Sequence, residues 1–532
     1  MALYKDVLDK NVLAQLRRIV GEENVTIDAK DLRYYSQDIY SEAKHHTLCG
    51  VKPRSIEELS QVVKLATENN YSAYPRGAGM SYTGGYLPTT SNGITIEMTG
   101  MNRIIEINKD DMYVTVEAGC TWEKLYQALK DEGLRTPFWG PLSGVLATVG
   151  GVISQNGAFF GSGTHGAAAD SVISICAVIA NGGIVNTGSN AVSDSKPFFR
   201  HYGPDLTGIF CGDSGALGFK ATITLRLIKA PPVKRFASFS FKDHSSLFKA
   251  SAAVGHSGLA VECFGFDPAL QKQRMKRESL AKDAKAFTDV IKANQSIKGA
   301  VKDAIQLSTS GRRFMDEVDY SLHITIEQHS DHAADHAFNE IQRMCEDAGG
   351  KAIANTIPKI ISANPFNPLT NMVGPMGERW APVHGLVAHS NAERTMRALA
   401  EYFACHKATM EKYGVEVGYL FAIIQTSVVI VEPVFFWPDE LMSVHERNLD
   451  STFYKRLNKF PANPEARAAV DEIHKGLVET FKSCKVAHFQ IAKCYPYSDV
   501  IAAESLVLIK AIKRSLDPKG LVNPGALGLS TD

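Results

Sequence analysis

Small residues crowd the stretch 75–85, which reads PRGAGMSYTGG. Small side chains let a backbone approach a ligand closely, and consecutive backbone N–H groups in such a loop can bind phosphate oxygens. A dinucleotide-binding fingerprint would also need a strand before the loop and a helix directly after it. Pro88, Gly93 and an alternating strand pattern follow instead. We therefore predict a phosphate-binding loop between two strands, with no helix dipole behind it.

Two further stretches are rich in glycine and alanine. Residues 140–172 read GPLSGVLATVGGVISQNGAFFGSGTHGAAADSV, and residues 212–227 read GDSGALGFKATITLRL. So many small residues in an ordered protein indicate close approach of the backbone to a flat or phosphorylated ligand. The alternative is that these glycines only make tight turns in a region of short strands.

Histidines occur in two groups whose spacing could suit a metal ion. His329, His332 and His336 fall on a charged helical pattern without an accompanying cysteine or carboxylate pattern, which favours a solvated helix face. His384 and His389 flank GLVA on a strand pattern, where a separation of five places them on opposite faces. We therefore predict no metal site, although His384 alone could face a ligand.

The overall composition restricts the class of protein. The chain has 532 residues, enough for two or three domains, and 57 Lys and Arg balance 57 Asp and Glu. This balance gives no general attraction to nucleic acid or to an acidic membrane surface. Nine scattered cysteines without a C-x-x-C pair indicate free thiols in a reducing compartment. No apolar run approaches the roughly 20 residues that span a bilayer, and the N-terminus lacks a signal-peptide core. We expect a cytoplasmic protein, for which a homodimer is a reasonable assembly.

Three segments must position these stretches. Residues 1–232 are dominated by short strands and hairpins, with helical patterns at 55–70 and 121–133. Residues 233–485 alternate long helical patterns with strands, which indicates an α/β layer with helices on one face of a sheet. Residues 486–532 contain a helical pattern and then the stop PKGLVNPGALG.

Five motifs occur in an order that identifies a family. PRGAGMSYTGG, VEAGCTWEKLYQAL, GGVISQNGAFFGSGTHGAAADSV, GDSGALGFKATITLRL and SLDPKGLVNPGALG follow one another as in the vanillyl-alcohol oxidase and p-cresol methylhydroxylase family of FAD oxidoreductases, which the chain resembles. In the middle segment the resemblance is weaker and depends on RWAPVHG. The resemblance as a whole implies an α+β fold. An FAD-binding domain of two α/β subdomains of the p-cresol methylhydroxylase type would span 1–232. An α/β cap domain, with an antiparallel sheet covered by helices, would span 233–485, and residues 486–532 would return to the FAD domain.

The resemblance also implies which residues hold FAD. The loop 75–85 would wrap the pyrophosphate with its backbone N–H groups, residues 150–166 would pass along the ribityl chain and flavin, and strand 219–228 would lie near the adenine. His165 is either a flavin neighbour or a loop histidine with locally satisfied nitrogens. The implied FAD-binding residues are Pro75, Arg76, Gly77, Ala78, Gly79, Met80, Ser81, Tyr82, Gly85, Pro141, Thr148, Gly150, Gly151, Ser154, Gly161, His165, Gly166, Gly218, Ile223 and Asn523.

The substrate site is implied less directly. In the phenol-oxidising branch a Tyr-Arg pair near the C-terminal return holds the substrate phenolate, and His488 and Phe489 align with that pair in a stretch with a strand pattern, VAHFQIA. The segment from Trp139 to Asn156 has no Asp or Glu to match the catalytic Asp of that branch. The candidates for a catalytic role are His488, ranked first, and Tyr82, Arg379, His384, Lys493 and Tyr495. The alternatives are that His488 packs in the core with its nitrogens bound by backbone, and that Arg379 forms a salt bridge.

By resemblance, the expected reaction moves a hydride from a phenolic, for example lignin-derived, aromatic alcohol or alkylphenol to flavin N5, with oxygen or a redox protein as electron acceptor. The alternative in the same superfamily is a 2-hydroxy-acid dehydrogenase, which needs cations for a carboxylate. A flavin-binding protein without turnover is the third possibility. We expect non-covalent FAD, because the loop 75–85 has no His and the stretch 421–437 has neither His nor Tyr, although Tyr419 lies just upstream.

Overall fold

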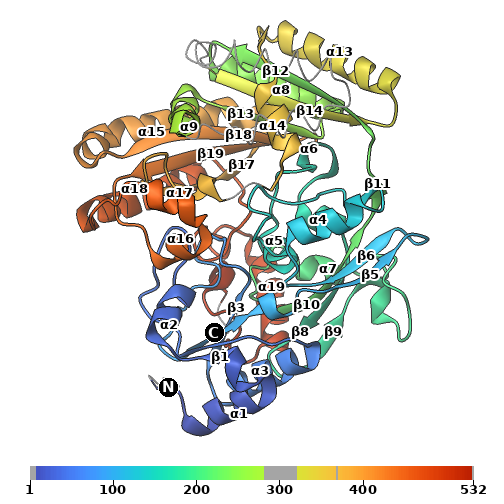
Figure 1. Ribbon diagram of the computed structural model, residues 1–532, viewed down its shortest axis with the longest axis vertical. Helices are drawn as coiled ribbons and strands as arrows, with labels where there is room; N and C mark the ends of the chain where they lie inside the picture. The colour runs from blue at the N-terminus through green and yellow to red at the C-terminus, as the bar shows by residue number, and fades with distance from the viewer. Residues whose placement is uncertain (1–6, 281–319, 367–368, 530–532) are drawn as a thin grey trace.

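The computed structural model describes residues 7–280, 320–366 and 369–529. Figure 1 shows two layers of the molecule. The blue to teal segments and the red C-terminal segment form the lower part, and the light green, yellow and orange segments form an upper part in which long helices cover a large sheet. Within the described residues, no helix combines the length and the apolar character needed to cross a membrane.

The first sheet supports the Gly-rich loop. Its strands have the order β1-β2-β4-β3, and β3 runs parallel to β4. Helix α3 (Ile56–Glu68) begins where the hydroxyl of Ser55 accepts a hydrogen bond from the N–H of Glu58, as the sequence predicts. The loop between β3 and β4 contains no helix along its whole described length. The strands are β1 Val25–Thr26, β2 Cys49–Val51, β3 Ser72–Arg76 and β4 Gly93–Glu97.

The second sheet lies beside the first and has the strand order β5-β6-β10-β8-β9. A hairpin joins β8 to β9, and the N–H of Ile179 donates to the carbonyl of Gly183 across its turn. Helix α4 (Trp122–Lys130) begins at its cap Thr121, also as predicted. The strands are β5 Ile104–Asn108, β6 Tyr113–Glu117, β8 Val172–Val178, β9 Ile184–Asn186 and β10 Phe219–Arg226.

The third sheet forms the upper part and has the order β15-β12-β14-β13-β18-β19-β16, with β17 also paired to β19. All of its pairings are antiparallel, as expected for the cap. The strands are β12 Val233–Phe241, β13 Glu262–Phe266, β14 Tyr320–Gln328, β15 Lys351–Ala352, β16 Arg379–Pro382, β17 Gly385–Ala388, β18 Glu416–Ile424 and β19 Val428–Trp437.

The two faces of this sheet have different partners, because side chains alternate along each strand. Phe421, Val431 and Phe435 lie on one face and pack with residues of the covering helices. Ala422 and Ile430 belong to the other face, which packs against a different cluster and points toward the FAD-binding half. The covering helices are α8 (His244–Ser257), α13 (Asp331–Asp347), α15 (Ala392–Tyr413) and α18 (Pro464–Ser483).

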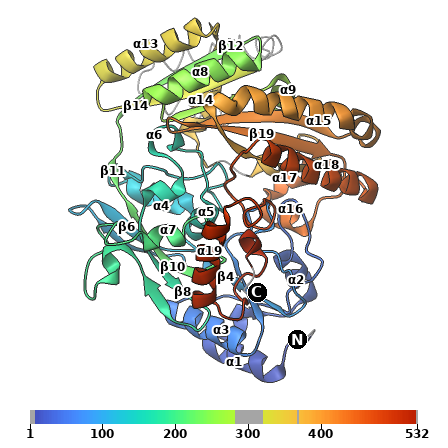
Figure 2. The same ribbon diagram turned by 180° about the vertical axis from the view of Figure 1, so that it is seen from behind.

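The C-terminal segment packs on the first two sheets. Figure 2 shows helix α19 (Ala503–Leu516) beside β8 and β10. The N–H of Ala73 donates to the carbonyl of Leu521, and Val522 forms a parallel bridge with Ala73. The side chain of Lys513 donates to the carbonyls of Ala216 and Val522. The domain boundaries at 232 and 485 stay predictions.

One local prediction was wrong. The stretch 486–492 is not a strand: Ala487 makes only an isolated bridge to Leu386, and Lys485, Gln490 and Ala492 have positive φ angles that turn the chain repeatedly. Helix α5 (Val149–Gln155), capped by the hydroxyl of Thr148, overlaps the stretch 150–166 and was not predicted from the sequence. Gly150 and Gly151 weaken the helical signal of this sequence, because glycine is unfavourable in helix interiors.

Candidate flavin site and substrate pocket

A cleft of about 280 Å³ lies between the FAD-binding half and the inner face of the cap sheet. The loop after β3, the start of α5 and the loop before β10 line one end. Side chains of β13, β18 and β19 and of the stretch 489–490 line the other end. One long cleft therefore connects a backbone-rich half to a half made of side chains.

The loop after β3 presents unused backbone donors to this cleft. The backbone N–H groups of residues 78–82 donate to no acceptor within the described part of the chain. The loop is nevertheless fixed, because the hydroxyl of Tyr86 donates to the carbonyl of Gly79 and the carboxylate of Asp38 accepts from the N–H of Gly84. Buried N–H groups need a partner, and a row of them suits phosphate oxygens. The loop therefore fits the pyrophosphate of a dinucleotide.

The chain itself also requires glycine at several cleft positions. Gly79 has φ +80°, and a Cβ there would lie 2.3 Å from Nη2 of Arg76. A Cβ on Gly77 would lie 2.6 Å from Oγ1 of Thr148, and one on Gly150 would lie 2.6 Å from the Cβ of Ala118. These glycines are needed for packing between loop and helix, not only for access by a ligand.

Fourteen of the twenty predicted FAD-binding residues line the cleft. They are Pro75, Gly77, Ala78, Gly79, Met80, Ser81, Tyr82, Gly85, Pro141, Thr148, Gly150, Gly151, Ser154 and Gly218. Whether each of them contacts FAD stays a prediction.

The other six lie outside the lining. Ile223 pairs with Val116 and Ile175 inside the second sheet, so its backbone is engaged, and Gly218, Phe219 and Lys220 line the cleft instead. Gly161 and Gly166 have positive φ angles in the turns around helix α6 (Ser162–His165), and burial lowers the pKa of His165 to about 4.

Arg76 and Asn523 support the cleft from behind. The guanidinium of Arg76 is buried 4.4 Å from the centre of the Tyr34 ring. The side chain of Asn523 donates to the carbonyls of Gly85 and Ser214, which belong to two different cleft loops. Asn523 therefore fixes these loops relative to each other.

The inner face of the cap sheet forms one wall of the side-chain half. Phe266, Leu420 and Glu432 are direct neighbours across β13, β18 and β19. Phe264, Ala422 and Ile430 form the next row on the same face, and Phe264, Leu420, Ala422, Ile430 and Glu432 line the cleft. These two rows are apolar except for the carboxyl group of Glu432.

Among the described residues, two acidic side chains line the cleft: Glu262, which is buried, and Glu432, which is half-buried. Burial raises the pKa of Glu432 to about 7, and nearby Arg274 partly opposes this shift. Burial also raises the pKa of Glu262, with a further contribution from Glu327, which itself forms ion pairs with Arg135 and Lys234. Our sequence analysis missed Glu432, although a single Glu within the apolar strand VVIVEPVFFW is a readable signal.

Aromatic residues line the same cleft as Glu432. The ring of Tyr82 lies edge-on to Trp380 with ring centres 5.3 Å apart, and Phe489 also lines this region. The side-chain amide of Gln490 donates a hydrogen bond to the hydroxyl of Tyr82. Burial holds the pKa of Tyr82 well above its ordinary value, so its hydroxyl keeps its proton. Trp380, Phe489 and Gln490 were not among the predicted site residues.

His488, the highest-ranked catalytic candidate, lies outside the cleft lining together with His384 and Tyr495, and a catalytic role for it stays a prediction. The Nδ1 atom of His488 is 2.8 Å from the carbonyl of His384, and its ring stacks on Tyr495. The hydroxyl of Tyr495 accepts from the N–H of His384, whose ring stacks on Phe489. Since the chain turns at Gln490, Phe489 and Gln490 face the cleft while His488 faces away.

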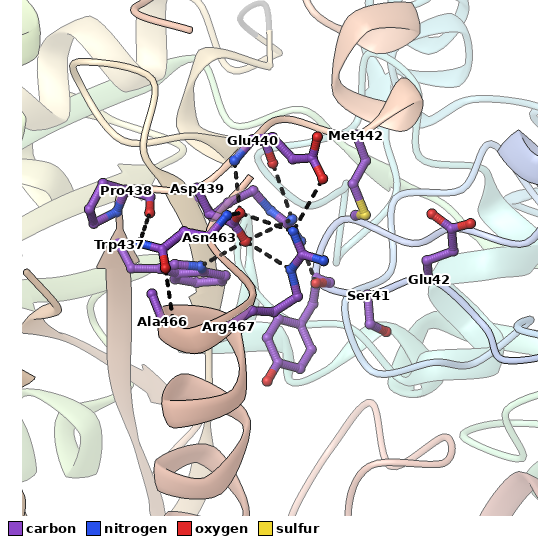
Figure 3. A network of polar contacts seen from close by, with 12 residues as sticks. Ser41, Glu42, Trp437, Pro438, Asp439, Glu440, Met442, Asn463, Ala466 and Arg467 are labelled. Atoms are coloured by element: carbon purple, nitrogen blue, oxygen red, sulfur yellow. Dashed lines mark hydrogen bonds and ion pairs between the residues drawn. The ribbon is translucent and has the colours of Figure 1, made fainter. Parts of the chain in front are cut away.

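Arg379 and Lys493 belong to supporting networks. Figure 3 shows Asp439 accepting hydrogen bonds from Arg467 and from the N–H of Asn463. Arg379 is 1% exposed, lies 3.9 Å from the same carboxylate, and donates to the carbonyl of Tyr40. This confirms the alternative that Arg379 is a salt-bridge residue, here a buried one. The Nζ of Lys493 donates to the carbonyl of Leu87 and to Asn523, and burial lowers its pKa to about 7.

Comparison with known proteins identifies the cofactor. Residues 47–188 match the model of the FAD binding domain family. This segment contains the loop with the unused N–H groups, so the domain match and the site geometry agree. The chain has an FAD-binding domain, and FAD is its cofactor.

Curated relatives match part of the chain in sequence, and a solved structure matches the fold of the whole chain. The chain is 29% identical to the glycolate oxidase subunit GlcD of Bacillus subtilis over 43% of this chain and 47% of the relative. It is 33% identical to the mitochondrial D-lactate dehydrogenase [cytochrome] of Arabidopsis thaliana over 48% of this chain and 44% of the relative. The chain thus spans about half the length of the curated relatives it matches. p-Cresol methylhydroxylase with substrate bound has a TM-score of 0.73 at 18% identity, covering 100% of this chain and 99% of that one, which shows the predicted fold.

Proposed function

We propose that the chain is an FAD-dependent oxidoreductase acting on an aromatic alcohol or alkylphenol. The observation that carries this proposal is the placement of Glu432, a half-buried carboxyl group that lines the FAD cleft together with Tyr82, Trp380 and Phe489. Bound FAD would supply the chemistry by accepting a hydride from the substrate carbon. The described residues must then bind the ring, orient its reacting carbon and accept a proton.

The aromatic residues suit the binding step. Tyr82, Trp380 and Phe489 offer ring faces and edges to a flat substrate, and such contacts restrict its orientation. The hydroxyl of Tyr82 receives the hydrogen bond of Gln490 and keeps its own hydrogen for a substrate oxygen.

Glu432 suits the proton step. Oxidation of an alcohol releases the hydroxyl proton together with the hydride, and the ionised carboxylate of Glu432 would take that proton. A pKa of about 7 matches this task near neutral pH, because it leaves a substantial ionised fraction in a carboxylate that is still basic.

A second candidate substrate class is a 2-hydroxy acid. It is favoured by the curated relatives, which are named as a glycolate oxidase subunit and a D-lactate dehydrogenase. The same carboxyl group could accept the proton from the 2-hydroxyl. The aromatic wall favours the first candidate, since a small aliphatic hydroxy acid would leave most of it uncovered.

Anaerobic mixing of the holoenzyme with both substrate classes tests the proposal. Aromatic alcohols or alkylphenols should bleach the flavin absorbance, and Glu432→Gln should slow bleaching by about 100-fold. Bleaching by aliphatic 2-hydroxy acids alone would move the second candidate ahead. No bleaching by either class would contradict both and favour a binding protein without turnover.

A further inference from the structure

The inner face of the cap sheet carries a second carboxyl group, Glu262, at the start of β13. Glu262 is 5% exposed and lines the cleft. Phe264 lies two residues further along the strand and therefore on the same face. The apolar row that begins at Phe264 separates Glu262 from the row that contains Glu432. The two carboxyl groups of the cleft therefore occupy different positions along the sheet and can have different roles.

The fold fixes the start of β13 against helix α6 of the FAD-binding half. The N–H of Gly163 donates to the carbonyl of Val261 at 3.0 Å, and the hydroxyl of Thr164 donates to the carbonyl of Ala260 at 3.1 Å. The Oε1 atom of Glu262 is buried beside these contacts and has no hydrogen-bond partner among the described residues. A buried carboxylate oxygen without a partner destabilises the ionised form, and a bound proton relieves that cost.

Three charged residues outside the cleft lining act on Glu262. Arg135 of β7 (Leu134–Arg135) and Lys234 of β12 lie 2.5 and 3.0 Å from the carboxylate of Glu327 on β14. The side chains of Arg135 and Glu327 are buried, whereas that of Lys234 is 32% exposed. The cluster therefore extends from the cleft at Glu262 to solvent at Lys234. Its two positive and two negative charges balance when both carboxyl groups are ionised.

The two carboxyl groups of this cluster differ in how readily they bind a proton. Burial alone would raise the pKa of Glu327, but Arg135 and Lys234 outweigh burial and hold that pKa below its ordinary value. Burial and the charge of Glu327 raise the pKa of Glu262, against the opposing effects of Lys234 and Arg135. Glu262 is therefore the carboxyl group of the pair that binds a proton first as the pH falls.

Further titratable or charged groups lie on the elements packed around this cluster. They are His165 on α6, the exposed Arg226 at the end of β10, and Lys359 on helix α14 (Thr356–Ala363), which packs on β12 and β14. Burial and Arg135 lower the pKa of His165 to about 4, so that His165 is uncharged near neutral pH. Glu262 consequently titrates in a setting whose other acid and bases keep their charge state around neutral pH.

We propose that Glu262 takes up one proton from solvent when the flavin in the cleft is reduced, and releases it when the flavin is reoxidised. A hydride brings two electrons and one proton to the cofactor, so reduction adds one negative charge to the cleft. This charge acts on Glu262 through a largely apolar space with little screening and favours its protonated form. One O–H bond forms on Glu262, its proton comes from bulk water at the solvent end of the cluster, and no further electron is needed. The inference rests on FAD as the cofactor and not on the proposed substrate class.

Redox titration of the wild-type holoenzyme and of Glu262→Gln between about pH 5 and about pH 9 tests the proposal. Dithionite reduces the flavin in place of a substrate, so the result does not depend on the proposed function. Glutamine resembles the protonated form of Glu262, so the midpoint potentials of the two proteins should agree at low pH. As the pH rises, the ionised Glu262 should lower the wild-type potential below that of the variant. A separation of at least about 30 mV is expected at high pH, which corresponds to a tenfold change in the proton affinity of Glu262 for a two-electron couple.

Glu346→Gln is the matched control, because Glu346 is an exposed glutamate of the cap on α13 and lies outside the cleft lining. Its potential should equal that of the wild type at every pH. Lys234→Gln removes a positive charge from the cluster and should move the pH range of proton uptake upward, since it destabilises ionised Glu262. This variant also tests the proposal against the wild type if Glu262→Gln does not fold.

Three results would overturn the proposal. The first is equal potentials of the wild type and Glu262→Gln at every pH. The second is a separation that does not change with pH, which would mean that Glu262 stays ionised in both redox states. The third is a pH range of proton uptake that Lys234→Gln leaves unmoved. A separation that grows with pH, found in a protein that oxidises no aromatic alcohol, would remove the proposed function and leave this inference standing.

Discussion

The side-chain amide of Gln490 donates a hydrogen bond of 3.1 Å to the hydroxyl of Tyr82, although the two residues are 408 positions apart. This contact joins the Gly-rich loop of the FAD-binding half to the segment that follows the cap. It aligns the Tyr82 hydroxyl with the space in which the substrate oxygen is proposed to lie.

Replacing Gln490 by methionine should slow flavin reduction by about 10-fold, because Tyr82 loses the donor that orients its hydroxyl. Methionine is unbranched and similar in length, which limits other changes at this residue of positive φ. Stopped-flow reduction with an aromatic alcohol measures the effect, and the FAD content should stay unchanged. An unaltered rate would show that this hydrogen bond has no role in positioning.

His488→Ala should leave the reduction rate nearly unchanged and lower the free energy of unfolding by about 1–3 kcal/mol. The ring of His488 packs on Tyr495 and contacts the His384 carbonyl outside the cleft lining, so its removal affects packing first. Urea unfolding and stopped-flow reduction of the same preparation separate the two effects. A large drop in rate with normal stability would restore the catalytic role suggested by the sequence alignment.

Flavin reduction should slow as the pH falls through about 7, because Glu432 must be ionised to accept a proton. Its folded-state pKa lies above the ordinary value of 4.5, so the stability it contributes is present below about 4.5 and is lost as the pH rises to about 7. The loss is on the order of 3 kcal/mol. Glu432→Gln should remove the pH dependence of the reduction rate and the pH dependence of the stability. Stopped-flow reduction measures the first, and urea unfolding at about pH 5 and about pH 8 measures the second. If the wild type and Glu432→Gln showed the same dependence on pH, the role of Glu432 as proton acceptor would be contradicted.

Gly151→Leu should give a folded protein that binds FAD weakly. Gly151 lines the cleft in the first turn of α5, and a Cβ there would meet only Oγ1 of Thr148, at 3.0 Å. Gly79 is a poorer probe. Because of its φ of +80° and the nearby Arg76, any side chain there would disturb the loop itself, whether or not FAD is bound. Thermal unfolding with and without added FAD is the measurement. The apo protein should unfold at or above the wild-type temperature, since leucine favours helix over glycine, while the stabilisation by FAD should largely disappear. A normal FAD-induced shift would mean that the cofactor does not pass this residue.

The FAD should be released by acid precipitation, which would leave a yellow supernatant. The described lining includes no histidine, and Leu420 and Ala422 of β18 face the cleft. Tyr419, the residue that left a covalent link open, alternates to the helix-facing side and stacks on Phe421. A yellow pellet would contradict non-covalent binding and point to Tyr82 or Tyr86 as the attachment site.

Local sequence was sufficient to predict the loop 75–85 and its lack of a following helix, because proline and glycine positions determine both. Local sequence failed at 486–492, where residues such as Gln490 adopt positive φ without being glycine. The side chains there do not alternate as in a strand, so the sequence pattern does not indicate which of them face the cleft. Ile223 was placed near the ligand because its strand was recognised, but the pairing of that strand on both sides could not be read from one sequence.

The bonds of Asn523 to Gly85 and Ser214 have a consequence for biosynthesis. A ribosome makes the Gly-rich loop early, yet the side chain that ties it to its neighbouring loop emerges only after the entire cap has been synthesised. The cofactor cleft therefore cannot mature while the chain is still growing through the cap. We expect the nascent FAD-binding half to wait in an open, incompletely ordered form and to capture its flavin only after residue 523 has left the ribosome.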